Sequence, residues 1–271
     1  MAKLKKLEGI LKGMSSVLLA YSGGVDSTFL LATAHRALGK KVLAVTAVSA
    51  TYPQEELDSA KRMAKKLGAR HKVIKTNEFA DLNFRSNPRN RCYYCKRELF
   101  SKLKRIAVRE RLNFVADASN ISDKKDFRPG RIAKKELAVR SPLQEAGLAK
   151  DDIRRLSKKM GLVTWNKPAL ACLASRVPYG TQISRDILSR VDLGERVLRG
   201  MGFKVVRLRH YNGLCRIEVG KDEIPRLIKK HNQVARQLKR LGYDFITLDL
   251  QGYRTGSMNE VIPRNYAGKN Y

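Results

Sequence analysis

The stretch from Leu18 to Thr28 constrains the possible folds more than any other part of the chain. An apolar run reaches the pair Gly23-Gly24, and the apolar residues beyond it recur at helical spacing, which predicts a strand, a tight turn and a helix. A helix start attracts anions through its backbone N–H groups and dipole, and adjacent glycines let a phosphate group approach the backbone closely. The turn also contains two hydroxyl donors and a carboxylate that can bind Mg²⁺, namely Ser22, Ser27 and Asp26. It therefore predicts a phosphate-binding loop.

Two common nucleotide-binding signatures do not fit this loop. It lacks the Gly-Lys-Ser/Thr of a Walker A loop and the Gly-x-Gly-x-x-Gly of dinucleotide folds. Its pattern, Ser-Gly-Gly-x-Asp-Ser, resembles the PP-loop of the ATP pyrophosphatase superfamily. That resemblance implies cleavage of ATP between its α and β phosphates, which leaves an adenylylated substrate. The alternative is an ordinary Gly-Gly turn, which is less favoured because strand, motif and helix all fall where phosphate binding needs them.

Strands and helices alternate through the first half of the chain. The expected elements are a helix over 25–38, a strand over 41–48, a helix over 53–67, and strands over 71–74 and 114–117. This alternation predicts an α/β fold, a parallel sheet flanked by helices and joined by right-handed crossovers. The adenine of ATP should then lie over the carboxyl ends of the strands, near Thr46. Asn120 and Asp123 follow another strand at that edge and are further candidates.

The composition is strongly basic. Lys and Arg outnumber Asp and Glu 56 to 25, for a formal net charge of +31. Such a balance favours anionic small substrates or polyanions such as RNA. The basic residues are spread along the chain without interleaved aromatic residues, so nucleic acid is possible but not favoured. The alternative is simply a basic, solvated surface.

The chain carries neither a membrane-span signal nor a signal peptide, which predicts a cytoplasmic protein without a membrane partner. We expect three parts: a PP-loop domain over 1–165, a linker over 166–182 that carries Cys172, and a smaller α+β domain over 183–271. In this last part the pattern predicts helices over 184–198 and 222–241, with a hairpin between them.

The four cysteines are too few for a disulfide framework in a chain of 271 residues. Cys92 and Cys95, in a C-x-x-C pair at a helix start, suit redox exchange, half of a zinc site or part of an iron–sulfur site. With Cys172 they could hold a [4Fe–4S] cluster with one iron open to a sulfide or a substrate. The alternative is three unrelated buried thiols. Cys215 lies on the apolar face of an alternating strand, which predicts a core residue.

Asn212-Gly213 predicts a two-residue hairpin turn, from which the strand register follows by counting. Arg207 then lies opposite Glu218, a favourable pair, and Arg209 lies opposite Arg216, an unfavourable pair unless an anion lies between them. Guanidinium groups bind phosphate and carboxylate well, so this arginine face is a candidate second anion site. The alternative is an exposed, solvated face.

Several motifs together resemble the LarE family, ATP-dependent sulfur transferases of the PP-loop superfamily that make the nickel-pincer nucleotide cofactor. The matching segments span nearly the whole chain and are residues 21–27, 90–99, 127–131, 140–143, 171–180 and 252–257. The resemblance implies a homohexamer and a substrate that is a pyridinium dicarboxylate mononucleotide. Each carboxylate would be adenylylated by ATP with Mg²⁺ and then attacked by sulfur. Members with three cysteines resemble cluster enzymes, so Cys92, Cys95 and Cys172 imply a [4Fe–4S] cluster that carries sulfide from a donor.

The resemblance also implies roles for residues of the C-terminal part. Arg207 and Arg209 would bind the substrate phosphate, and Glu195 and Glu218 would lie near an inter-subunit metal site. Further site candidates are Ser175, Arg176 and Arg216. Two other functions remain open: a PP-loop tRNA thiolation enzyme with an iron–sulfur cluster, and an iron–sulfur protein that binds ATP without turning it over.

Overall fold

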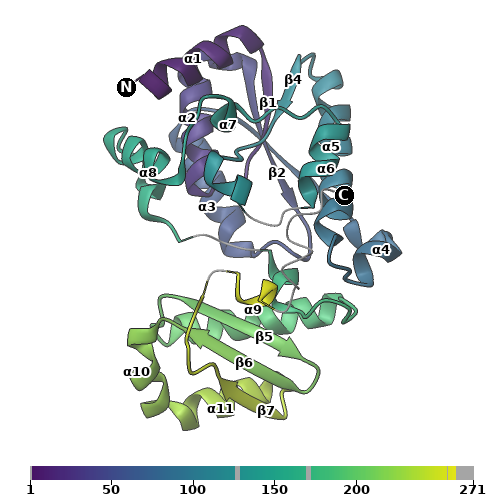
Figure 1. Cartoon of the computed structure of the whole chain (residues 1–271), viewed down its shortest axis with the longest axis vertical. Coiled ribbons are helices and arrows are strands. Elements are labelled where there is room, and N and C mark those ends of the chain that lie inside the picture. Colours follow the sequence, from purple (N-terminus) through teal and green to yellow (C-terminus); the bar gives the residue numbers. More distant parts are fainter. Residues whose placement is uncertain (1, 126–128, 169–171, 255, 261–271) are drawn as a thin grey trace. The chain divides into compact units, whose positions relative to one another are not determined.

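The computed structural model describes residues 2–125, 129–168, 172–254 and 256–260. Phe127, Arg128, Ala171 and Thr255, which belong to the matched motifs, lie outside the described residues. The chain forms two compact units (Figure 1), one of residues 1–84 and 90–170 and the other of residues 85–89 and 171–271.

The first unit is built on a four-stranded parallel sheet in the order β3-β2-β1-β4. The strands are β1 (Val17–Ala20), β2 (Val42–Val48), β3 (Arg70–Lys75) and β4 (Phe114–Ala116). The helices are α1 (Ala2–Met14), α2 (Val25–Leu38), α3 (Gln54–Lys66), α4 (Leu82–Arg85), α5 (Arg91–Arg109), α6 (Gly130–Glu136), α7 (Pro142–Glu145) and α8 (Lys150–Lys159). The α/β fold with a parallel sheet is thus confirmed.

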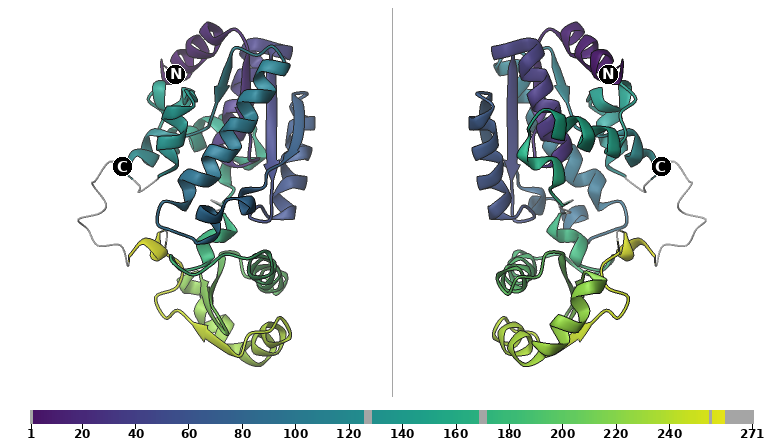
Figure 2. Two further views of the ribbon diagram at one scale, coloured as in Figure 1. Left: turned by 90° about the vertical axis from the view of Figure 1, so that its right-hand side faces the viewer. Right: turned by 90° about the vertical axis from the view of Figure 1, so that its left-hand side faces the viewer.

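Both faces of this sheet are covered by helices, as Figure 2 shows. On one face Val17 and Leu19 pack in a core shared with α1, α2 and α8. On the other face Leu18 packs with Phe100 and Leu103 of α5. Because successive strand residues point to opposite faces, the continuous apolar run of β1 is what a central strand buried on both sides requires.

The second unit contains a mixed three-stranded sheet, in which β5 (Val206–Tyr211) and β6 (Leu214–Val219) form an antiparallel hairpin. Its other elements are β7 (Phe245–Leu248), parallel to β6, and helices α9 (Arg185–Gly200), α10 (Ile224–Lys229) and α11 (His231–Arg240). The predicted hairpin register is confirmed, with Arg209 opposite Arg216 and Arg207 opposite Glu218. The helix expected over 222–241 is instead two helices, because Lys230 has a ψ of 13° between them.

Residues 85–89 pack with the second unit, a placement that their position in the sequence does not indicate. Asn87 is buried and donates hydrogen bonds from Nδ2 to the carbonyls of Pro178 (2.7 Å) and Thr181 (3.0 Å). Its own carbonyl accepts one from the Gly180 amide (2.9 Å). Asn87 therefore fastens the segment that follows Cys172. None of the described helices is long and apolar enough to span a membrane.

Packing of α9 on β5 depends on Gly194, and a substitution there tests this part of the fold. A Cβ at Gly194 would overlap Leu208 Cδ2 and lie 3.3 Å from Leu238 Cδ2. We expect Gly194→Ala to lower the free energy of unfolding by about 1–3 kcal/mol, measured by urea unfolding. Gly200→Ala, in the same helix with no atom within 4 Å of its Cβ, is the control and should leave stability unchanged or slightly raised. Equal effects of the two substitutions would contradict this packing.

Candidate functional site

The turn between β1 and α2 is shaped by Gly23. Its φ is +67°, and a Cβ there would lie 2.8 Å from the Cβ of Ala60 on α3. Only glycine meets both conditions without strain. Gly24 then begins α2, and no described side chain caps this helix start. The first N–H groups of α2 are therefore available to an anion.

The two serines of the loop lie against each other. Ser22 Oγ and Ser27 Oγ are 3.1 Å apart, and Ser27 Oγ also donates to the Gly24 carbonyl (3.2 Å). The hydroxyl of Tyr52 donates to the Ser22 carbonyl (2.8 Å). The loop is thus held in one shape by its own contacts, with both hydroxyl groups beside the start of α2.

Of the two carboxylate oxygens of Asp26, one pairs with a lysine and the other has no hydrogen-bond partner among the described residues. Oδ2 forms an ion pair with Lys150 Nζ at the start of α8 (2.6 Å). Oδ1 is the oxygen without a partner, and it is buried. Burial raises the pKa of Asp26, and Lys150 opposes that shift. A buried oxygen without a partner at a phosphate-binding turn suits Mg²⁺, a cation that prefers oxygen ligands.

Two lysines that the sequence analysis did not single out contact this loop, although they lie near the C-terminal end of the first unit in the sequence. Besides Lys150 on Asp26, Lys167 donates from Nζ to the Gly23 carbonyl (3.3 Å) and forms a 2.7 Å ion pair with Glu56. Neither lysine belongs to a motif, and each lies more than 120 residues from its partner in the loop. No local signal in the sequence could have revealed them.

Two further candidates of the first unit, Thr46 and Asn120, are buried, and Asp123 is half-buried. Thr46 is fully buried, and its hydroxyl is 2.8 Å from His71 Nε2. Burial lowers the pKa of His71, which keeps the ring neutral. Asn120 is 2% exposed, and its backbone N–H donates to the Asp123 carboxylate (2.9 Å). The charge of Asp123 contributes to raising the pKa of Asp26, so Asp123 is electrostatically coupled to the PP-loop.

The cysteines are distributed over both units. Cys92 is exposed and Cys95 half-buried in the first turn of α5, where their spacing puts them on one face of the helix. Cys172 is exposed in the second unit, and Cys215 is buried in its core, as predicted. Burial raises the pKa of Cys215 to about 12. Thiol donors suit iron or zinc, but among the described residues no group of three His, Cys, Asp or Glu side chains is arranged to hold a metal.

A buried ion pair holds the turn that follows Cys172, a 3-10 helix over Leu173–Arg176. Arg176 is 1% exposed and donates to both oxygens of Glu195 (2.8 and 3.0 Å). It also donates to the Cys172 carbonyl (3.1 Å). Burial alone would raise the pKa of Glu195, but the charge and hydrogen bonds of Arg176, the charge of Arg207 and the Leu208 amide together lower that pKa. The exposed thiol therefore projects from a backbone fixed by a buried guanidinium.

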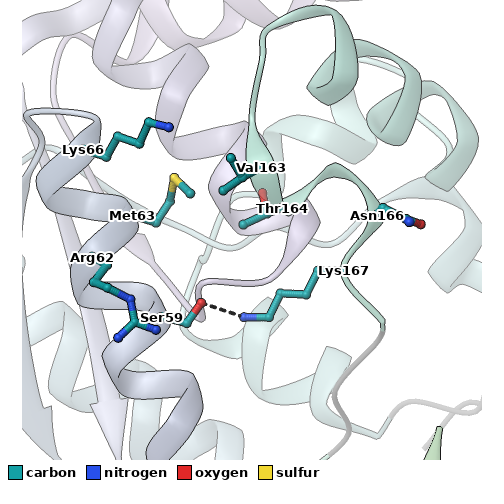
Figure 3. Close-up of a pocket in the computed structure, with 8 residues that line it drawn as sticks. All are labelled: Ser59, Arg62, Met63, Lys66, Val163, Thr164, Asn166 and Lys167. Atoms are coloured by element: carbon teal, nitrogen blue, oxygen red, sulfur yellow. Dashed lines mark hydrogen bonds between the residues drawn. The ribbon is translucent and has the colours of Figure 1, made fainter. Parts of the chain in front are cut away.

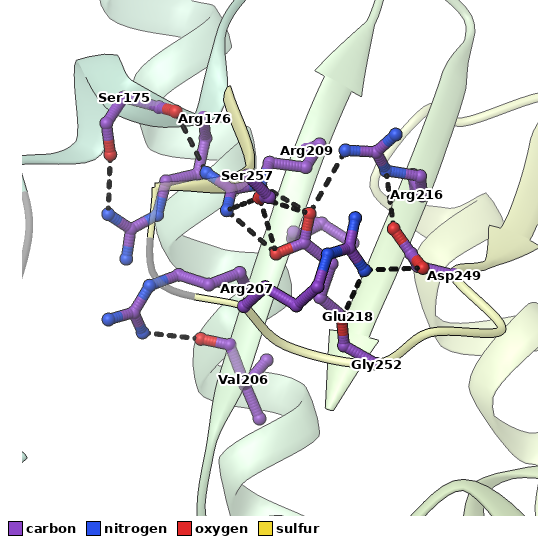
Figure 4. A network of polar contacts seen from close by, with 12 residues as sticks. Ser175, Arg176, Val206, Arg207, Arg209, Arg216, Glu218, Asp249, Gly252 and Ser257 are labelled. Atoms are coloured by element: carbon purple, nitrogen blue, oxygen red, sulfur yellow. Dashed lines mark hydrogen bonds and ion pairs between the residues drawn. The ribbon is translucent and has the colours of Figure 1, made fainter. Parts of the chain in front are cut away.

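The arginine face of the hairpin differs from expectation in what lies between its arginines (Figure 4). Arg209 donates to both oxygens of Glu218 (2.9 and 2.7 Å), and Arg216 donates to Glu218 Oε1 (3.1 Å). The expected anion between the two arginines is therefore the protein's own carboxylate. The reason is side-chain reach: Glu218 lies two residues from Arg216 on the same face of β6, and the diagonal partner Arg209 is long enough to meet it.

Arg207 lies beside this network and is also buried. It donates to the Val206 carbonyl (2.7 Å), and its guanidinium lies 5.1 Å from the centre of the Tyr253 ring. Burial and the nearby charge of Arg176 lower the pKa of Arg207. Figure 4 shows the guanidinium groups of Arg207 and Arg176 on the same side of the network. Two neighbouring guanidinium groups make this side attractive to an anion.

A pocket of about 640 Å³ lies within the second unit, next to Arg216. Its lining contains two tyrosines, two arginines, a serine and one carboxylate among smaller and apolar residues, and consists of Pro88, Arg89, Pro178, Tyr179, Gly180, Tyr211, Arg216, Ser257, Met258 and Glu260. The guanidinium of Arg216 lies 5.5 Å from the centre of the Tyr211 ring. Such a lining suits a molecule with an aromatic ring and acidic groups.

Two partial matches bear on the class of the protein. A family model described as the argininosuccinate synthase N-terminal HUP domain matches residues 16–124, which contain the PP-loop and the parallel sheet. An NH₃-dependent NAD⁺ synthetase of Chlorobaculum tepidum is 40% identical over 28% of the chain and 28% of its own length. The chain is thus a protein of the PP-loop ATP pyrophosphatase superfamily.

Two relatives match almost the whole chain. An uncharacterised protein of Synechocystis is 39% identical over 97% of this chain and 99% of its own length. A pyridinium-3,5-bisthiocarboxylic acid mononucleotide synthase of Lactiplantibacillus plantarum is 38% identical over 97% of this chain and 95% of its own length. The chain belongs to the LarE family.

The unengaged oxygen of Asp26 can be tested by Asp26→Asn. We expect this change to lower ATP–pyrophosphate exchange by about 10²–10³-fold, because the neutral amide lacks the negative charge that makes a carboxylate a good Mg²⁺ ligand. The fold should survive. Since burial raises the pKa of Asp26, its charged form opposes folding near neutral pH, and the variant should be no less stable there. Asp222→Asn, at an exposed carboxylate, is the control; exchange that falls equally in both variants would contradict the role of Asp26.

The ion pair beneath Cys172 predicts a pH dependence. Glu195→Gln leaves the Arg176 guanidinium buried without its counter-charge, and we expect the free energy of unfolding near neutral pH to fall by about 3–5 kcal/mol. Because the folded-state pKa of Glu195 lies below 4.5, its contribution is present above that pH and is lost as the pH falls through the lowered pKa. The difference in free energy of unfolding between wild type and variant, measured by urea unfolding, should therefore decrease as the pH falls. Glu260→Gln, at an exposed carboxylate, should change little; a difference independent of pH would refute the assignment.

Proposed function

We propose that the protein is an ATP-dependent sulfur transferase of nickel-pincer nucleotide biosynthesis. It adenylylates a carboxylate of a pyridinium dicarboxylate mononucleotide and replaces a carboxylate oxygen by sulfur. The observation that carries this proposal is the uncapped start of α2 beside the unengaged Oδ1 of Asp26, in a chain 38% identical to a synthase of a bisthiocarboxylic acid mononucleotide.

In the activation step the PP-loop holds the β and γ phosphates of ATP. The N–H groups at the start of α2 and the hydroxyls of Ser22 and Ser27 provide donors, and Asp26 binds the Mg²⁺ that accompanies the nucleotide. Lys150 and Lys167 add positive charge to the same loop. An oxygen of the acceptor carboxylate attacks the α phosphorus, the bond to the β-phosphate oxygen breaks, and pyrophosphate leaves.

The acceptor is bound by the second unit. Its pocket of about 640 Å³ is large enough for a mononucleotide and offers Tyr211 and Arg216 to an aromatic dicarboxylate. Arg207 and Arg209 are proposed to bind the substrate phosphate. The buried Glu218 orients Arg209, since it accepts two of that side chain's hydrogen bonds.

In the transfer step a sulfur nucleophile attacks the acyl adenylate. Its sulfur bonds to the carbonyl carbon, the bond to the AMP oxygen breaks, and AMP leaves with that oxygen. Cys92, Cys95 and Cys172 are proposed to hold a [4Fe–4S] cluster, whose open iron would keep sulfide from an external donor available as a nucleophile. The turn fastened by Arg176 and Asn87 holds the backbone of Cys172 in place. A homo-oligomer is proposed as the working assembly.

Separating the two steps tests the proposal. We expect Cys172→Ala to keep substrate-dependent pyrophosphate release from ATP but to lose formation of the thiocarboxylate, measured by mass spectrometry of the acceptor after anaerobic purification. Cys215→Ala, in the core of the second unit, is the control and should keep both steps. Full sulfur transfer by Cys172→Ala would contradict the assignment. Pyrophosphate release stimulated by tRNA, but not by the dicarboxylate, would favour the tRNA thiolation alternative instead.

A further inference from the structure

The first unit also contains a pocket beside the PP-loop, and of its lining residues only Lys167 has a part in the steps above. The pocket has a volume of about 540 Å³ and lies between α3 and the segment 163–167 (Figure 3). Its lining residues are Ser59, Arg62, Met63, Lys66, Val163, Thr164, Asn166 and Lys167. Figure 3 shows Met63 and Lys66 extending from α3 toward that segment, Arg62 lying along α3, and Lys167 reaching back toward Ser59.

All the charged side chains that line this pocket are positive. Arg62 and Lys66 lie one turn apart on α3 and are exposed, and Lys167 closes one end of the pocket. None of the lining residues is acidic, and Glu56 pairs with Lys167 from outside the lining. Cations gathered in a concave surface create a positive potential that attracts small anions.

The donors inside the pocket point to a phosphoryl group. Thr164 is 4% exposed, yet its hydroxyl has no hydrogen-bond partner among the described residues. A buried hydroxyl without a partner is unfavourable, and a bound ligand would satisfy it. Ser59 and Asn166 supply further donors, and Met63 and Val163 supply an apolar surface. Several donors and cations around one space match the oxygens of a phosphate, which accept hydrogen bonds in several directions.

We propose that this pocket binds the phosphoryl group of a small phosphorylated molecule, held by Arg62, Lys66 and Thr164. Pyrophosphate and AMP share this chemistry, and both are released when ATP is split; that source rests on the proposed function. The pocket communicates with the PP-loop through Lys167, whose Nζ donates to Ser59 Oγ (3.1 Å) and to the Gly23 carbonyl (3.3 Å). An anion bound in the pocket competes for the Lys167 ammonium group and so weakens its hydrogen bond to the Gly23 carbonyl of the loop.

The test uses the full-length protein saturated with α,β-methylene-ATP, an analogue that occupies the PP-loop without being split. Pyrophosphate and AMP are then titrated separately by calorimetry. We expect a further saturable binding event in the wild type, weakened about tenfold or more in Arg62→Gln/Lys66→Gln because two charge-assisted contacts are lost. Thr164→Val, which removes only the hydroxyl, should weaken it less. Lys40→Gln/Lys65→Gln removes the same charge at exposed residues outside the pocket and should bind as the wild type does.

The outcomes separate this inference from the proposed function. Binding of pyrophosphate alone identifies an oligophosphate site, and binding of AMP identifies a nucleotide site; either supports the pocket. Absence of the second event in the wild type, or equal loss in both double variants, overturns the inference although the analogue binds. Failure of the analogue itself to bind would instead refute the PP-loop as an ATP site. In that case the pocket would still be supported if pyrophosphate or AMP bound in the absence of the analogue and this binding depended on Arg62 and Lys66.

Discussion

The close approach of Gly23 to Ala60 is the constraint on which the first unit depends. A side chain at residue 23 would place its Cβ 2.8 Å from the Cβ of Ala60, and the φ of +67° disfavours any residue but glycine. Because the turn passes so close to α3, the start of α2 is directed at the carboxyl edge of the sheet with its N–H groups uncapped. Asp26, Ser22 and Ser27 are thereby brought to one anion site, and the two lysines that reach the loop arrive from distant segments.

The second unit depends on a different balance, that of buried charges. Arg176 with Glu195 and Arg209 with Glu218 are ion pairs with exposures of 5% or less. Removing such groups from water is unfavourable unless geometry and hydrogen bonds compensate, so their value lies in fixing one arrangement rather than in stability alone. They fix the backbone around Cys172 and the orientation of Arg209, which is proposed to bind the acceptor. Under the proposed function, ATP activation and acceptor binding therefore depend on different interactions in the two units.

How much of this could be predicted from the sequence depends on the range of each interaction. The β1–α2 turn and the hairpin register were predictable, because a Gly-Gly turn and an Asn-Gly turn determine local geometry that then propagates along the strands. The partner of Arg209 was not, since register sets which residues face each other but not how far a long side chain reaches diagonally. Lys150 and Lys167 were not either, because their contacts with the loop exist only once α8 and the 163–167 segment have packed. The same holds for Asn87, whose buried amide meets carbonyls about 90 residues away.

The central claim is that the acceptor carboxylate itself attacks the α phosphorus of ATP. It is tested most directly by labelling that carboxylate with heavy oxygen and following the label by mass spectrometry through one round of sulfur transfer. The account predicts that AMP acquires one labelled oxygen, because the oxygen that attacked phosphorus leaves with AMP when sulfur takes its place. AMP without label, or ADP as the nucleotide product, would contradict the account.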